Sequence, residues 1–164
     1  MKVYTAPEHV ENDYPIIFLA GGITHCSDWQ KEVVKYFRNK DYNYVLCNPR
    51  RDNFPIYDLN ASHEQIKWEF DCLERCDVFT IYFDYSEKSD QPICFYELGR
   101  NLLRMKEKFP DDWDKRIVIT CNNDFRRFLD VVIQTELAVK SKVHVNIGDV
   151  YTHIYAIEET IKYL

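Results

Sequence analysis

Short apolar runs alternate with segments of helical periodicity along the chain, and this alternation most constrains the fold. Ile16–Ala20 is a continuous apolar run, as expected for a strand buried on both faces. Further strands are predicted at 44–47, 78–83, 116–121 and 143–147. A capping box, with Ser27 as N-cap and Gln30 reaching back, predicts a first helix that runs to about residue 39. Further helices are predicted at 62–75, 94–108, 124–139 and 150–164.

Strands that alternate with helices imply a parallel sheet covered by helices on both faces. The 164 residues suffice for one domain with a substantial core. We therefore predict a single-domain, doubly wound α/β fold of the flavodoxin or Rossmann type over residues 1–164, with a mostly parallel five-stranded sheet. Residues 1–14 are expected to be a loosely structured lead-in. Ligands of such folds bind beyond the carboxyl ends of the strands.

Composition narrows the class of partner. Hydrophobic residues make up 46% and aromatic residues 15% of the chain, which is typical of a globular protein. The net charge of -6 indicates no basic face for a nucleic-acid polymer, so a small metabolite is favoured. The start of the chain has no apolar run typical of a signal peptide, and no segment approaches the roughly 20 apolar residues of a membrane span.

Six cysteines bear on the compartment and on metal binding. Cys72 and Cys76 share one helix face, but no suitably spaced histidine completes a zinc set, and no Cys-x-x-Cys pair occurs. We expect free thiols in a reducing cytoplasm and no metal site. The protein is therefore predicted to be cytoplasmic.

The segment Phe95–Arg100 places Glu97 at the predicted start of a helix, just beyond an apolar strand and a polar loop. The positive end of the helix dipole can hold such a carboxylate ionised and facing a cleft. A preorganised carboxylate is what nucleophilic attack on a sugar carbon requires. The alternative is that Glu97 only complements the helix dipole.

Two loops at the carboxyl ends of strands carry candidate binding residues. Gly21 and Gly22 allow a ligand to approach the backbone closely, or they form a plain turn between strand and helix. Arg50 and Arg51, beside Asn48, could hold a phosphate or carboxylate through bidentate hydrogen bonds. The alternative is a solvated surface pair or a structural ion pair with the neighbouring aspartate.

Four further polar residues are candidates. Glu69, packed beside Trp68, could have a raised pKa and act as a general acid, or be an exposed helical residue paired with a nearby base. Asp77 is expected to play a structural role at the start of a strand. Asp90 and Gln91 lie in the loop that leads to Glu97, where they would face whatever Glu97 contacts.

In order along the chain, these pieces resemble the nucleoside 2-deoxyribosyltransferase family. The segments that carry the resemblance are Ile17–Ile23, Asp28–Gln30, Asn48–Arg51, Gln65–Glu69, Cys76–Asp77 and Tyr96–Arg100. They are similar to the branch of the family with Asn-Pro-Arg-Arg and Trp-Glu motifs. Together they span over half of the chain.

The resemblance implies that Glu97 attacks the anomeric carbon of a 2-deoxyribonucleoside, expels the base and forms a covalent deoxyribosyl-enzyme. A second base, or water, then takes the sugar with net retention, and no cofactor is needed. Glu69 matches an acidic residue that supports sugar binding or proton transfer. Gln91 stands where the founding enzymes have aspartate, and Phe18 where they have an orienting tyrosine. Tyr163 is the candidate that would complete a neighbouring subunit's site.

The leading function is therefore transfer of a deoxyribosyl group between nucleobases. The runner-up is hydrolysis of 2-deoxynucleoside 5'-monophosphates, with Arg50, Arg51 and the 22–24 turn serving the phosphate. The rival from another class is a nucleotide-binding or sensor module without turnover. Because the C-terminal segment 151–164 is rich in apolar residues, we also expect a homo-oligomer, at least a dimer.

Overall fold

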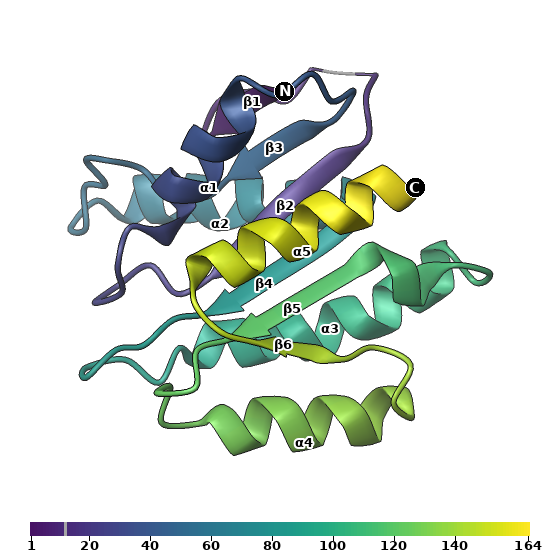
Figure 1. The fold of residues 1–164 in the computed structure, drawn as a ribbon. Coiled ribbons are helices and arrows are strands. Elements are labelled where there is room, and N and C mark those ends of the chain that lie inside the picture. The colour runs from purple at the N-terminus through teal and green to yellow at the C-terminus, as the bar shows by residue number, and fades with distance from the viewer. Residues whose placement is uncertain (12) are drawn as a thin grey trace.

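The computed structural model describes residues 1–11 and 13–164, and a single parallel sheet forms its centre. The strand order is β1-β3-β2-β4-β5-β6, and every neighbouring pair is parallel. The strands are β1 (Lys2–Thr5), β2 (Ile16–Gly21), β3 (Val45–Asn48), β4 (Val78–Phe83), β5 (Ile117–Cys121) and β6 (Val145–Ile147). The predicted doubly wound α/β class is confirmed (Figure 1).

The predicted strand number was wrong, because the described residues form six strands rather than five. The additional strand, β1, falls within the supposed lead-in of residues 1–14 and pairs with β3 from Lys2 opposite Val45 to Thr5 opposite Asn48. At the edge of the sheet its burial is uneven: Tyr4 is buried, Val3 and Thr5 are half-buried, and Lys2 is exposed. A short segment with few apolar residues gives little sequence signal, and only pairing with β3 makes it a strand.

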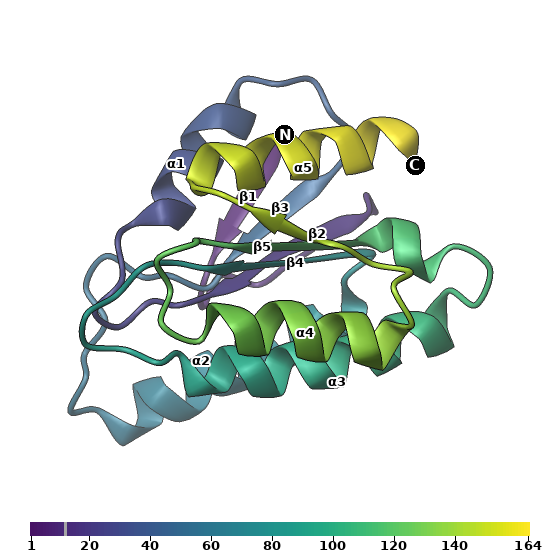
Figure 2. The same ribbon diagram turned by 60° about the horizontal axis from the view of Figure 1, so that its bottom comes forward.

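Among the described residues, two α-helices cover one face of the sheet and three cover the other. Figure 2 shows the sheet nearly edge-on between these two layers. On the first face lie α1 (Trp29–Arg38) and α5 (Val150–Tyr163). On the second lie α2 (Leu59–Arg75), α3 (Pro92–Lys108) and α4 (Phe128–Val139). None of the helices in the described part of the chain has the length and apolar character needed to cross a membrane.

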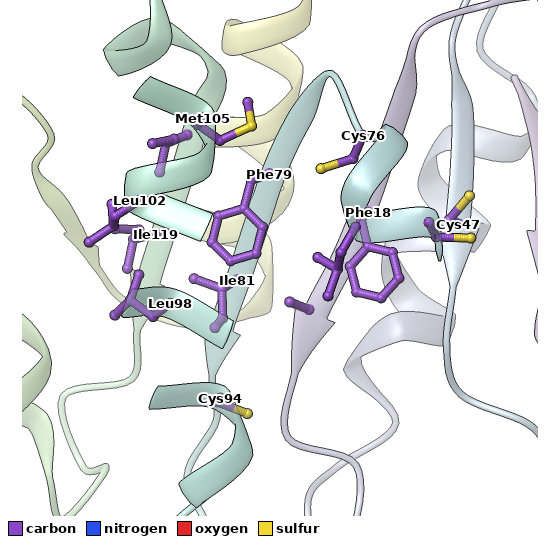
Figure 3. Close-up of a cluster of buried hydrophobic side chains, with 14 of the residues drawn as sticks. Phe18, Cys47, Cys76, Phe79, Ile81, Cys94, Leu98, Leu102, Met105 and Ile119 are labelled. Carbon is purple, nitrogen blue, oxygen red and sulfur yellow. The ribbon is translucent and has the colours of Figure 1, made fainter. Parts of the chain in front are cut away.

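The central strands are buried on both faces, which explains their continuous apolar sequence. In β2, Ile17 and Leu19 pack under α1 and α5, whereas Phe18 and Ala20 face α2 and α3. Figure 3 shows Phe18 beside Cys47 and, across the cluster, Leu98 near Ile81. All six cysteines are free, and all but Cys26 are buried.

The start of α1 differs from the predicted capping box. Asp28 is the N-cap, and its side chain accepts from the backbone N–H of Lys31. Ser27 instead donates from its N–H and its hydroxyl to Asp84 Oδ2, at 2.9 and 2.6 Å. Gln30 is fully buried and accepts a hydrogen bond from Arg50. Ser27 does not cap the helix because it is hydrogen-bonded to the carboxylate of Asp84, which follows β4. No local sequence pattern could reveal this long-range contact.

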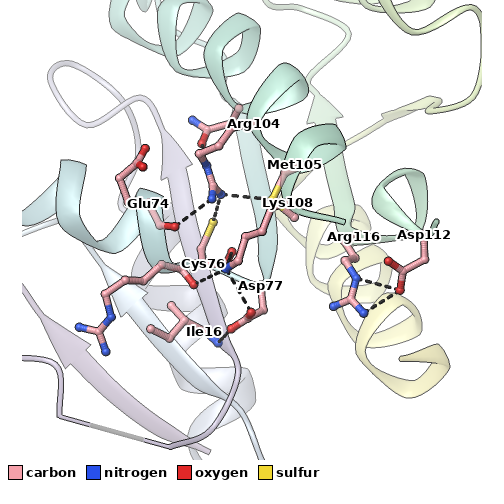
Figure 4. A network of polar contacts seen from close by, with 11 residues as sticks. Ile16, Glu74, Cys76, Asp77, Arg104, Met105, Lys108, Asp112 and Arg116 are labelled. Carbon is pink, nitrogen blue, oxygen red and sulfur yellow. Dashed lines mark hydrogen bonds and ion pairs between the residues drawn. The ribbon is translucent and has the colours of Figure 1, made fainter. Parts of the chain in front are cut away.

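A polar network joins the C-terminal end of α2 to α3 (Figure 4). Lys108 Nζ donates to the carbonyl of Cys76 at 3.0 Å and lies 3.3 Å from Asp77 Oδ1. Asp77 Oδ2 also accepts the backbone N–H of Ile16 at 2.8 Å, which confirms its predicted structural role. The network fixes α2, α3 and the start of β2 relative to one another.

The topology creates a crevice at one end of β2. The chain leaves β2 through α1 to reach β3 on one side, and leaves β3 through α2 to reach β4 on the other. Strand β2 is followed by a helix on one face of the sheet, whereas its neighbours β3 and β4 are followed by helices on the other face. The connections therefore diverge at the carboxyl end of β2. Such a switch point is where open α/β sheets bind ligands.

Candidate active site

A cavity of about 270 Å³ lies at this switch point. The part contributed by β2 and its following loop includes Phe18, Gly21 and Gly22. Helix α2 contributes Glu69, and the segment from Ser89 into α3 contributes Gln91 and Glu97 among others. The structure thus brings together the following predicted site residues: Phe18, Gly21, Gly22, Glu69, Gln91 and Glu97.

Glu97 lies in the second turn of α3 rather than at its start, because the helix begins at Pro92. The pKa of Glu97 is raised to about 8, chiefly by burial and secondly by the charge of Glu69, while Arg100 opposes both. The expectation that the helix dipole keeps Glu97 ionised was therefore wrong. Loss of hydration outweighs the dipole, whose effect fades within the first turn.

Glu69 is partly buried on α2, and burial raises its pKa, as predicted for a carboxyl packed among apolar groups. Neither of the nearby basic side chains pairs with Glu69 in the described structure: Lys67 binds Asp71, and Arg75 donates to the carbonyl of Val10. Its partner is Gln65, whose Nε2 lies 2.7 Å from Glu69 Oε1. The cavity therefore holds two carboxyl groups whose charges affect each other.

Gln91 is buried in the cavity wall and is the N-cap of α3, with a left-handed backbone at φ 49°. Its Nε2 donates to the carbonyl of Asp84 at 2.7 Å, which leaves Oε1 near the Cys94 thiol at 4.0 Å. Asp90, by contrast, turns away to pair with Arg126 at 2.7 Å and does not line the cavity. Of the two loop residues predicted to face Glu97, only Gln91 lines the same cavity.

Phe18 supplies an apolar part of the cavity wall. Its ring is buried and lies 6.3 Å, centre to centre, from the ring of Trp68. The phenyl ring can pack against a ligand but offers it no hydrogen bond.

Arg50 and Arg51 do not line the cavity. The Arg50 guanidinium donates to the carbonyls of Ser27 and Cys26 and to Gln30, and its Nε lies 3.5 Å from Asp28. It holds the loop between β2 and α1 against the end of β3.

Arg51 pairs with Glu64 at 3.4 Å and lies over the Phe54 ring. Asn48 Oδ1 accepts the backbone N–H of Arg50 at 3.0 Å, and Asn48 lines a separate groove along α1. The ion pairs of the two arginines are therefore with Asp28 and Glu64, not with the adjacent Asp52. No lysine, arginine or histidine is among the residues described around the cavity.

A family model described as "Nucleoside 2-deoxyribosyltransferase like" matches residues 14–109. That segment is more than half of the 164 residues. The chain belongs to the nucleoside 2-deoxyribosyltransferase-like family. A search of curated protein sequences gives no match.

The segment matched by the nucleoside 2-deoxyribosyltransferase-like family runs from just before β2 to the end of α3 and contains every residue around the cavity. Tyr163 lies outside it. Its hydroxyl accepts from Lys115, which precedes β5, so Tyr163 lies at the amino-terminal edge of the sheet, opposite the cavity. Within one chain Tyr163 does not reach the site.

Among the residues at or beside the cavity of this family member, Gln65, Asp84 and Cys94 had no site role predicted from the sequence. Gln65 precedes Glu69 by four residues, so helical spacing alone placed both on one face. Asp84 and Cys94 carried no such signal, because their contacts depend on loops that meet in space. In the described part of the chain, no group of three or more His, Cys, Asp or Glu side chains could hold a metal ion.

Proposed function

We propose that the protein cleaves the N-glycosidic bond of a 2-deoxyribonucleoside and transfers the deoxyribosyl group to another nucleobase through a covalent glycosyl–Glu97 intermediate. The observation that carries the proposal is the pair Glu69 and Glu97 in one cavity at the switch point of the sheet. A retaining glycosyl transfer needs two carboxyl groups, one as nucleophile and one as acid and base.

The reaction would proceed in two displacements. The Glu97 carboxylate attacks the anomeric carbon, the carbon–nitrogen bond breaks, and its electron pair leaves with the base while Glu69 gives the base a proton. A second base then attacks the same carbon, Glu97 leaves as carboxylate, and Glu69 takes the proton of the incoming base. Two inversions give net retention, and no metal or cofactor takes part.

These roles require an ionised Glu97 and a proton on Glu69. Because the pKa of Glu97 is about 8 in the free cavity, the proton must pass from Glu97 to Glu69 before attack. Mutual repulsion and burial disfavour the doubly ionised state, so one proton is shared over a wide pH range. Gln91 cannot act as an acid, which makes Glu69 the proton donor in this cavity. Gln91 Oε1 is an acceptor for an N–H group of the base.

The same cavity favours a nucleoside over its 5'-monophosphate. A phosphate dianion beside two carboxyl groups needs a basic partner. The described lining has none, and Arg50 and Arg51 are engaged elsewhere. The lining therefore disfavours hydrolysis of 2-deoxynucleoside 5'-monophosphates, and the experiment below tests this activity as well.

The proposal is tested by incubating the purified protein with deoxynucleosides and their monophosphates, with and without a free acceptor base, and separating the products by chromatography. A new nucleoside formed with ping-pong kinetics supports transfer. Release of free sugar at a rate that ignores the added base would shift the assignment to a hydrolase. Ligand binding without any product, in wild type and Glu97→Ala alike, would favour a binding module.

A further inference from the structure

Gln65 makes two short contacts through one atom. Its Nε2 lies 2.6 Å from the carbonyl oxygen of Pro49 and 2.7 Å from Glu69 Oε1. The side chain is 91% buried, because only 9% of its surface is exposed. Its Oε1 has no hydrogen-bond partner among the described residues.

These contacts settle the orientation of the carboxamide. The Pro49 carbonyl can only accept, so an amide turned the other way would place two acceptor oxygens against each other. Both N–H groups of Gln65 are therefore used, one on Pro49 and one on Glu69. The lone unpartnered oxygen is the cost of this arrangement.

The contact also distinguishes the two oxygens of Glu69. Oε1 accepts the N–H of Gln65, so a proton carried by Glu69 belongs on Oε2. We propose that Gln65 is a positioning residue that fixes Oε2 of Glu69 as the oxygen that exchanges a proton with the substrate. The inference rests on the proposed function and assigns it a residue outside the cavity lining.

The surroundings of the pair determine the direction of the effect. The charge of Glu69 acts on Glu97 and Cys94 of α3, and Gln65 of its own helix α2 donates to it. Arg100 acts on Glu97, and Cys26 in the loop after β2 acts on Cys94. β2 and the end of β3 present Phe18 and Pro49, which carry no charge. Gln65 is the one hydrogen-bond donor to Glu69 in the described structure, and it favours the ionised carboxylate.

The test is Gln65→Met, which keeps the bulk of the side chain and removes both N–H groups. The matched control is Gln134→Met, since Gln134 also donates to a carboxylate four residues away, Asp130, but on the exposed surface of α4. Gln65→Asn, whose shorter side chain cannot span both oxygens, serves if the methionine variant does not fold. Folding is checked by thermal unfolding of each variant.

Two measurements separate this inference from the proposed function. Carbon-13 NMR of glutamate-labelled, substrate-free protein follows the titration of Glu69 whether or not the protein turns over. We expect Glu69 to titrate about one pH unit higher in Gln65→Met. An unchanged titration would overturn the inference even if the enzyme is active.

The second measurement is the pH dependence of kcat/KM for nucleoside cleavage. Because Glu69 must hold its proton to act as the acid, the alkaline limb should move to higher pH by the same amount, whereas the acid limb, which reports ionisation of Glu97, should stay. Activity at alkaline pH should therefore rise about tenfold relative to activity near pH 5.5. A uniform loss at every pH would overturn the positioning role. An inactive wild type would remove the proposed function and leave the titration as the test of Gln65.

Discussion

Gly22 and Gln91 are in such close contact that a Cβ built on Gly22 would lie 2.5 Å from Gln91 Oε1. Gln91 cannot retreat easily, because it is buried and bonded to the Asp84 carbonyl. The glycine is therefore required for space: it lets the wall of the cavity close around Gln91.

Gly22→Ala should displace the Gln91 side chain and lower kcat/KM by about ten- to hundredfold, since misplacement of a site group by about 1 Å has this effect. Steady-state kinetics give the measurement. Gly99→Ala is the control, because no atom lies within 4 Å of a Cβ at this exposed helical site and alanine there should stabilise α3 by about 0.5–1 kcal/mol. Equal activity of the two variants would show that Gly22 is only a turn residue.

Glu97→Ala should fold normally and lose several orders of magnitude in turnover, because covalent catalysis has no substitute path in the cavity. A slow 2-fluoro substrate analogue should leave a sugar adduct on Glu97 that mass spectrometry detects in the wild type. Turnover near the wild-type level in the alanine variant would remove the proposed mechanism.

Glu97 also predicts a pH dependence of stability. Its pKa is about 8 in the folded state against 4.5 for the free side chain, so the folded protein keeps a proton that the unfolded chain releases. The free energy of unfolding should therefore fall as pH rises from about 4.5 to 8.

Glu97→Gln should remove much of this slope and stabilise the protein at pH 8 by at least about 1 kcal/mol, with little gain at pH 4.5. Urea unfolding at several pH values measures this difference. Glu69→Gln should lower the pKa of Glu97, because it removes the second cause of the shift. A stability gain of Glu97→Gln that is the same at both pH values would contradict the raised pKa.

Arg50→Met should lower the free energy of unfolding by about 1–3 kcal/mol, since it removes the guanidinium contacts to Gln30 and to the loop before α1. It should change the KM for a nucleoside and for its monophosphate by the same factor. Arg51→Met is the comparison, because its pairing with exposed Glu64 is worth less than about 1 kcal/mol. An increase of KM confined to the monophosphate would restore Arg50 as a phosphate ligand.

The oligomeric state remains a prediction of at least a dimer. In α5, Ile154, Ile157 and Ile161 are buried against the chain's own sheet, whereas Tyr163 is 68% exposed. Because Tyr163 lies opposite the cavity of its own chain, it could complete only the site of another subunit. Light scattering that shows an active monomer would remove the shared site. Removal of residues 163–164 without loss of activity would exclude Tyr163 alone.

The sequence by itself determined the layout of the fold. The apolar run at 78–83 coincides with β4, and the run at 16–20 is β2 less its last residue, Gly21. Continuous apolar runs arise only where both faces of a strand are covered, so they predict central parallel strands well. It also indicated the family, because the segments that carry the resemblance lie within the matched region 14–109.

Only the tertiary structure decided how the site residues interact. Glu69 and Glu97 are 28 positions apart in the sequence, and their coupled protonation exists because α2 and α3 meet beside β2. Likewise, Ser27 donates to Asp84 instead of capping α1, and Arg50 binds loop carbonyls instead of facing the cavity. Local patterns record burial and periodicity, whereas charge, hydration and hydrogen-bond partners depend on groups that only folding brings together.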